Sequence, residues 1–113
     1  MGGVRAGVVV LVRFPFSDLS SSKLRPALVV ASAGGTDWIL CQITSNRYSD
    51  PRAVALTTES FAEGGLPRES FVRPMKLFTA SESIVVRSVG RITALAHGKV
   101  VEAIVNVFQA ALR

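Results

Sequence analysis

The feature that most constrains the fold of this chain is a series of short apolar runs, each rich in β-branched or aromatic residues and each ended by turn residues. Such runs are typical of β-strands, and the Gly, Pro, Ser and Asp residues between them are typical of turns. No helical stretch separates the runs, so parallel strands joined by helical crossovers are not expected. The sequence therefore predicts a mainly β fold, a small barrel or sandwich. Strands are expected over residues 8–14, 27–31, 38–43, 53–56, 84–86 and 90–92, and another begins at 70–73.

The C-terminal segment has a different period. Its polar residues recur every three or four positions and alternate with an apolar set, which is the pattern of an amphipathic helix. Thr93 is the expected N-cap of this helix. We expect the apolar face to close one side of the sheet. The polar set is Lys99, Glu102, Asn106, Gln109 and Arg113, and the apolar set is Val101, Ile104, Val105, Phe108 and Leu112.

Length and composition narrow the class of protein. A chain of 113 residues fits one domain, predicted to span 1–113, and a hydrophobic content of 49% predicts a packed core with some apolar surface left for a subunit interface. The net charge of +5 suits a polyanionic partner such as RNA, DNA or an acidic peptide, although many ordinary basic proteins share it. No run approaches the ~18 apolar residues of a membrane span, and Arg13 interrupts the apolar run at 8–12. A cytoplasmic protein with no membrane partner is expected.

Several kinds of catalytic site are not predicted. His97 is the one histidine, and without a partnered nucleophile it is interpreted as a surface residue rather than part of a triad. Cys41 is the one cysteine, and its apolar neighbours predict a buried, inert thiol. Ligand spacing for a metal and a glycine-rich phosphate loop are both absent from the sequence. We therefore expect neither a metal nor a cofactor.

Cations and hydroxyls are concentrated instead at the ends of three predicted strands. They occur in Ser20-Ser21-Ser22-Lys23-Leu24-Arg25-Pro26, in Ile43-Thr44-Ser45-Asn46-Arg47 and in Phe71-Val72-Arg73-Pro74-Met75-Lys76. Guanidinium groups and oriented hydroxyls are the groups that hold a phosphodiester. Solvated loop ends explain the same pattern equally well, so the residues alone leave both interpretations open.

The same segments resemble the signature of the MazF/PemK-like toxins of type II toxin–antitoxin systems. Phe14-Pro15-Phe16-Ser17 and the Lys23-Leu24-Arg25-Pro26 motif, followed by Ala27-Leu28-Val29-Val30, are similar to the N-terminal part of that family. Ile43-Thr44-Ser45, the segments 70–74 and 76–79, and Val89-Gly90-Arg91-Ile92 before the last helix resemble its later parts. The resemblance covers about residues 7–112.

The resemblance implies an SH3-like β-barrel with a C-terminal helix, a homodimer, and a separate antitoxin protein that wraps the dimer. It also implies an endoribonuclease that cuts single-stranded RNA at selected sequences without a metal. The RNA's own 2′-hydroxyl would act as the nucleophile, leaving a 2′,3′-cyclic phosphate and a 5′-hydroxyl.

By the same resemblance, Arg25 is the central catalytic residue. It would contact the scissile phosphate and take part in proton transfer, and the first role is the better founded because an arginine is very hard to deprotonate. Thr44, helped by Ser45, would donate hydrogen bonds to the phosphate oxygens. Arg73 matches a position that serves as a general acid or a second phosphate clamp.

The remaining RNA-binding predictions are Lys23 and Lys76, which would guide the backbone, and Phe16, which would either stack on a base or lie in the core. Two departures from the family pattern matter. Gly7-Val8 replaces a common Gly-Asp, and Met75 stands where many relatives have Asp. If that Asp is a general base, its loss removes a contribution of ~10²–10⁴ in rate. Weakened activity, full activity and inactivity therefore all stay open.

Two rival functions follow from the resemblance. A CcdB-like gyrase poison has the same fold, but it depends on an aromatic C-terminal end, and this chain ends Phe108-Gln109-Ala110-Ala111-Leu112-Arg113 without the terminal Trp. A non-catalytic module that binds RNA or antitoxin is made plausible by Met75. For the antitoxin itself, we expect an acidic amphipathic segment that covers Arg25 and Arg73.

Overall fold

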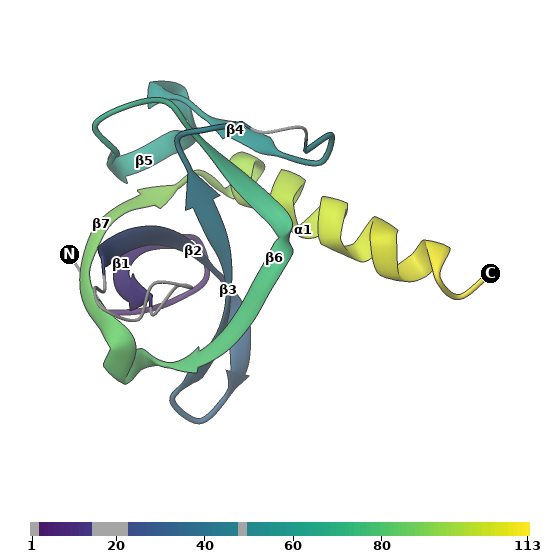
Figure 1. The fold of residues 1–113 in the computed structure, drawn as a ribbon, viewed down its shortest axis with the longest axis horizontal. Helices are drawn as coiled ribbons and strands as arrows, with labels where there is room; N and C mark the ends of the chain where they lie inside the picture. The colour runs from purple at the N-terminus through teal and green to yellow at the C-terminus, as the bar shows by residue number, and fades with distance from the viewer. Residues whose placement is uncertain (1–2, 15–22, 48–49) are drawn as a thin grey trace.

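The computed structural model describes residues 3–14, 23–47 and 50–113. Seven β-strands form one sheet, and a long helix follows them (Figure 1). Two short 3-10 helices at Thr58–Ser60 and Glu82–Ile84 lie between strands. The elements are β1 (Val8–Phe14), β2 (Lys23–Gly34), β3 (Asp37–Thr44), β4 (Val54–Leu56), β5 (Phe61–Gly64), β6 (Ser70–Ser81), β7 (Val85–Ile92) and α1 (Ala94–Ala110).

The sheet is antiparallel throughout and has the strand order β4-β6-β3-β2-β1-β7-β5. It curls strongly, so that β1, β2, β3, β6 and β7 surround a common interior (Figure 1). The predicted mainly β fold with one C-terminal helix is confirmed, in the form of a curled half-barrel. A tight turn at Gly34 and Gly35, both with positive φ, joins β2 to β3.

The strands extend further than the sequence indicated. The segment predicted at 27–31 belongs to a strand that begins at Lys23 and ends at Gly34, and the one beginning at 70–73 continues to Ser81. The first three of the added residues of β2 are exposed, so burial does not mark them as strand, yet residues 11–14 of β1 pair with residues 23–26. Strand β5 was not predicted, because three of its four residues are exposed.

The core lies on both faces of the sheet. Successive residues of β1 point to opposite sides, so Val8 and Val10 belong to one buried cluster and Val9 to the other. This arrangement explains why the start of β1 is apolar at every position instead of alternating. Leu28 and Val29 divide between the same two clusters in β2.

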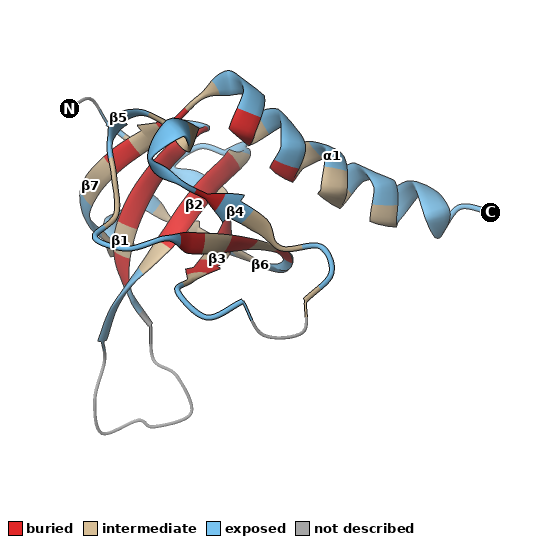
Figure 2. Cartoon of the chain, turned by 90° about the horizontal axis from the view of Figure 1, so that it is seen from above, coloured by how far each residue is buried: buried red, intermediate tan, exposed pale blue. Residues whose placement is uncertain are grey.

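Helix α1 begins as predicted, with the Thr93 hydroxyl accepting a hydrogen bond from the Ala96 amide at 3.1 Å. Ala96 and Val100 are buried against the sheet, so the first half of the helix closes one side of it. The second half extends beyond the sheet (Figure 2). Phe108 is 60% exposed there, so the expected closure by the whole apolar face is wrong for the C-terminal end.

The predictions for Cys41 and His97 had opposite outcomes. Cys41 is buried as expected, and burial raises the pKa of its thiol to about 12, which makes it unreactive. The interpretation of His97 as a surface residue is wrong. Its Nε2 lies 3.1 Å from the carbonyl oxygen of Val30, which can only accept, so the imidazole N–H donates and ties α1 to β2. No helix in the described parts of the chain is both long enough and apolar enough to cross a bilayer.

Candidate functional site

A cavity of about 450 Å³ opens where β2 and β3 meet the segment that joins β5 to β6. Three sequence stretches that are far apart in the chain form its walls, together with β7. Four of the predicted site residues line it, and two arginines that were not predicted join them. The polar lining residues are Lys23, Arg25, Thr44, Ser45, Arg68, Ser70 and Arg87, and the apolar ones are Leu11, Leu24, Pro26, Ile43, Gly65, Leu66, Pro67 and Val89.

Arg25 and Lys23 come from the exposed beginning of β2. Arg25 pairs with Val12 and Lys23 with Phe14, so both cations are carried by strand backbone that β1 holds in register. Side chains two residues apart in a strand point to the same face. The two cations therefore reach the same side of the sheet from a rigid support, which a loop would not provide.

Thr44 and Ser45 lie where β3 ends. The Thr44 Oγ1 accepts a hydrogen bond from the Asn46 amide at 3.1 Å, which fixes the hydroxyl and closes a tight turn. A hydroxyl that accepts one hydrogen bond still has its own hydrogen to donate. Thr44 is thus a pre-oriented donor on the cavity wall.

Arg68 and Arg87 are the site residues that sequence reasoning missed. Arg87 lies in β7 opposite Leu11 of β1, and that pairing brings it to the cavity. The buried Ser70 donates a hydrogen bond from its Oγ to the Arg68 carbonyl at 3.0 Å, which fixes the backbone at Arg68. Arg68 directly follows the turn residues Gly64-Gly65-Leu66-Pro67, which was the one sign in the sequence that it could lie at a strand end. A turn alone does not show which other strands lie beside the residue that follows it.

The cavity is strongly cationic. It has four positively charged residues, and none of the described residues that line it is acidic. Guanidinium and ammonium groups beside the hydroxyls of Thr44 and Ser45 suit an anion with several oxygens, such as a phosphodiester. Among the described residues, no group of three or more His, Cys, Asp or Glu side chains is arranged to hold a metal ion.

Arg73 is not among the residues that line this cavity. Its Nε donates to the Asp50 Oδ2 at 3.2 Å, and both side chains are largely buried. Partial burial alone would raise the pKa of Asp50. The hydrogen bond from the Arg52 amide and the guanidinium of Arg73 outweigh this effect, so the pKa lies below its ordinary value. The structure therefore supplies Arg73 with a carboxylate from position 50, although position 75 has none.

The remaining predicted residues lie elsewhere. Lys76 is exposed on β6 and does not line the cavity, and Met75 beside it is 37% exposed. Phe16 falls outside the described residues.

Comparison with known proteins supports one family. The model of the PemK-like, MazF-like toxins of type II toxin–antitoxin systems matches residues 5–108. A comparison with curated protein sequences finds no significant match.

Solved structures share the fold at low sequence identity. A toxin MazF-mt6 from Mycobacterium tuberculosis is 21% identical, with a TM-score of 0.69 over 90% of this chain and 96% of that one. A MazE–MazF structure from Deinococcus radiodurans is 18% identical, with a TM-score of 0.77 over 96% and 98% of the two chains. A mycobacterial endoribonuclease in complex with its cognate antitoxin is 16% identical, with a TM-score of 0.71 over 96% of each chain.

Proposed function

The chain belongs to the PemK-like, MazF-like family of type II toxins, and on that premise we propose that it is an endoribonuclease that cleaves single-stranded RNA without a metal. The observation that carries the proposal is the cavity where Arg25 and Thr44 meet. Its cationic lining, with no acidic residue among those described, matches the charge of a phosphodiester backbone.

The chemistry needs little more than charge and orientation. The 2′-oxygen of the RNA attacks the adjacent phosphorus, its proton leaves to a base, and the bond from phosphorus to the 5′-oxygen breaks as that oxygen gains a proton. The products are a 2′,3′-cyclic phosphate and a 5′-hydroxyl. Arg25 stabilises the charge that builds up on the phosphorane oxygens, and the Thr44 hydroxyl donates a hydrogen bond to one of them. Ser45 beside it supplies a second hydroxyl.

The other cations of the cavity would bind the flanking phosphates. Lys23, Arg68 and Arg87 come from three separate segments of the chain and line the same cavity. They would therefore bind phosphates on either side of the one that is cut. Arg73 remains a proposed second phosphate clamp or general acid, since its guanidinium is oriented by Asp50. Lys76 on the same strand would guide the backbone further along.

We also propose a homodimer and an antitoxin partner. The exposed apolar residues Val105 and Phe108 at the projecting end of α1 are available for a second subunit, and sedimentation velocity measures the resulting mass. An acidic antitoxin segment would cover Arg25 and Arg73. A double Arg25→Ala, Arg73→Ala variant is then expected to lose antitoxin affinity, and an unchanged affinity would contradict this overlap.

The test of the enzyme proposal is incubation of the antitoxin-free protein with a long single-stranded RNA in excess EDTA. Discrete cuts are expected for the wild type and for Lys99→Ala, a control that removes an exposed cation of α1 far from the cavity in sequence. No cuts are expected for Arg25→Ala. Cleavage that needs a metal, or that persists in Arg25→Ala, would contradict the proposal.

A second candidate function rests on Met75. A module that binds RNA or antitoxin without cutting would bind the same RNA in the same cavity. Cleavage by Met75→Asp but not by the wild type would show that the missing carboxylate limits activity. Tight RNA binding with no cleavage by either protein would favour the binding module.

A further inference from the structure

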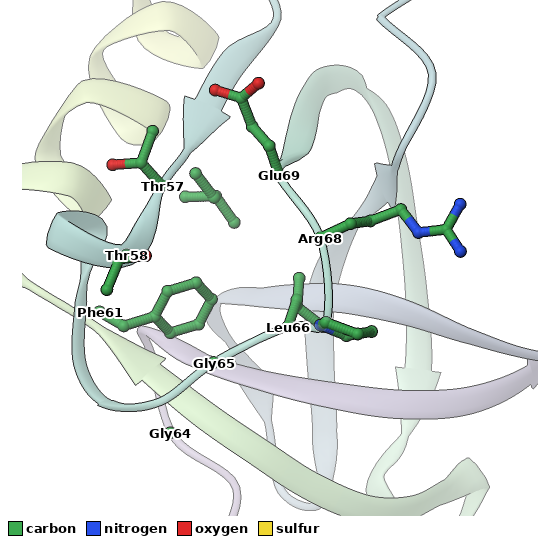
Figure 3. A pocket seen from close by; sticks show the side chains of 10 residues that line it. Thr57, Thr58, Phe61, Gly64, Gly65, Leu66, Arg68 and Glu69 are labelled. Carbon is green, nitrogen blue, oxygen red and sulfur yellow. The ribbon is translucent and has the colours of Figure 1, made fainter.

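A second cavity, of about 410 Å³, lies directly beside the cationic one. The two share the wall formed by Gly65, Leu66, Pro67 and Arg68. The lining of the second cavity differs in kind, because it combines an aromatic ring, two hydroxyls and a carboxylate (Figure 3). These groups belong to Phe61, Thr57, Thr58 and Glu69, and Leu56 and Gly64 complete the lining.

The shared wall is fixed by close backbone packing. Gly64 has φ of +61°, and a Cβ added there would lie 2.2 Å from the carbonyl oxygen of Val89. The Gly65 amide donates to that same oxygen at 3.1 Å. Beyond this point, Ser70 holds the Arg68 carbonyl. The wall therefore keeps a set spacing between the two cavities.

The two cavities differ in their charged lining: the cationic cavity has four cations and no acidic residue among those described, whereas the second has Glu69 and shares Arg68. Figure 3 shows the Arg68 side chain directed away from Thr57, Phe61 and Glu69, and Arg68 also lines the cationic cavity. One side of the wall thus presents cations, and the other has a carboxylate at one edge of the cavity and an aromatic ring at the opposite edge (Figure 3). A nucleotide has the complementary pair of groups, an anionic phosphate and a planar base.

We propose that the second cavity is a nucleobase subsite that reads one base next to the scissile phosphate, and that this base is guanine. The inference rests on the proposed ribonuclease function. The half-buried Phe61 ring offers a stacking surface, and a cavity of this size lies in the range of small-molecule sites. A carboxylate only accepts hydrogen bonds, and guanine is the base with two adjacent N–H donors, N1–H and the 2-amino group, to match both oxygens of Glu69.

An acidic antitoxin segment fits this cavity less well. Its carboxylates would meet Glu69, whereas the cationic cavity next to it would attract them. The subsite is therefore assigned to RNA rather than to protein.

The test measures binding without cleavage. Once the cut site of the wild type is mapped, oligonucleotides carrying a 2′-deoxy nucleotide at the cut are varied one base at a time on either side, and their affinities are measured by fluorescence anisotropy. The wild type is expected to prefer guanine at one flanking position by about tenfold. Glu69→Gln is expected to lose that preference at that position alone. Glu102→Gln, which removes an exposed carboxylate on α1, is expected to keep it.

Phe61→Leu provides a second variant that retains an apolar side chain. It is expected to weaken binding of every base at the same position and to leave the other positions unchanged. If Glu69→Gln and Phe61→Leu keep the wild-type base preferences while Arg25→Ala abolishes cleavage, the subsite is refuted and the enzyme proposal stands. If both variants lose antitoxin affinity with unchanged base preference, the cavity is a protein site. A wild type that neither binds nor cuts RNA overturns both proposals.

Discussion

Gly64→Ala is predicted to destabilise the protein by about 2–3 kcal/mol. The new methyl group would clash with backbone atoms, which cannot rotate away as a flexible side chain can. The left-handed conformation costs a non-glycine residue about 1–2 kcal/mol, and the reduced freedom of the unfolded chain returns about 0.4–1 kcal/mol. The added Cβ would lie 2.2 Å from the Val89 carbonyl oxygen and 2.8 Å from the Gly90 Cα, so β5 or β7 must shift. Overpacking of this kind costs about 1–3 kcal/mol more.

Gly35→Ala is the matched control for this prediction. Gly35 has φ of +57°, close to the +61° of Gly64, but an added Cβ there meets nothing within 4 Å. It therefore has the same conformational cost without the clash, and a loss of about 0–1.6 kcal/mol is expected. The difference between the two variants isolates the packing of the wall against β7.

The assay is urea unfolding of both variants and the wild type, followed by circular dichroism at one protein concentration. With an m value of about 2 kcal/mol/M, Gly64→Ala is expected to lower the midpoint by about 1–1.5 M and Gly35→Ala by less than about 0.8 M. Equal midpoints for the two variants would refute the reasoning, because they would show that the close approach of Gly64 to Val89 does not constrain the fold.

Three further predictions concern the ion pair, the helix cap and the cationic cavity. Asp50 has a lowered pKa, so its pairing with Arg73 stabilises the fold above the unfolded pKa of about 3.9 and is lost as pH falls. Asp50→Asn is therefore expected to cost about 1 kcal/mol in urea unfolding at pH 7 and nothing near pH 2, and an equal loss at both values would contradict the ion pair. Thr93→Ala removes the acceptor of the Ala96 amide and is expected to cost about 1 kcal/mol in the same assay, with an unchanged midpoint as the opposing result. Arg87→Ala is expected to reduce the slope of log affinity for single-stranded RNA against log salt by about 0.7, whereas a wild-type slope would remove Arg87 from the phosphate contacts.

Local signals predicted much of the fold. Alternating and continuous apolar runs identified most strands, and the hydroxyl of Thr93 marked the helix start that the structure confirms. Two of the missed parts are exposed at nearly every position. The first three residues of β2 are exposed and are strand only because β1 pairs with them, and β5 is a short, exposed edge strand. His97 was misjudged because its partner, the Val30 carbonyl, is distant in sequence.

The site residues likewise fall into those that the sequence predicted and those that it did not. Lys23, Arg25, Thr44 and Ser45 were predicted, and they line one cavity, because neighbouring strands bring those strand ends together. Arg68 and Arg87 reach the cavity through the packing of β7 and of the segment before β6, which no local pattern encodes. For Arg73, the sequence showed a missing carboxylate at position 75 but gave no sign of Asp50.

The measurement that tests the central claim most directly compares two RNA oligonucleotides carrying the mapped cut site. One is all-ribose, and the other has a single 2′-deoxy nucleotide on the 5′ side of the cut. In excess EDTA, the protein is expected to cut only the all-ribose strand, leaving a 2′,3′-cyclic phosphate that mass spectrometry identifies, and Arg25→Ala is expected to cut neither. Equal cutting of both strands, or products that carry a 5′-phosphate, would contradict cleavage by the RNA's own 2′-hydroxyl in the Arg25 cavity.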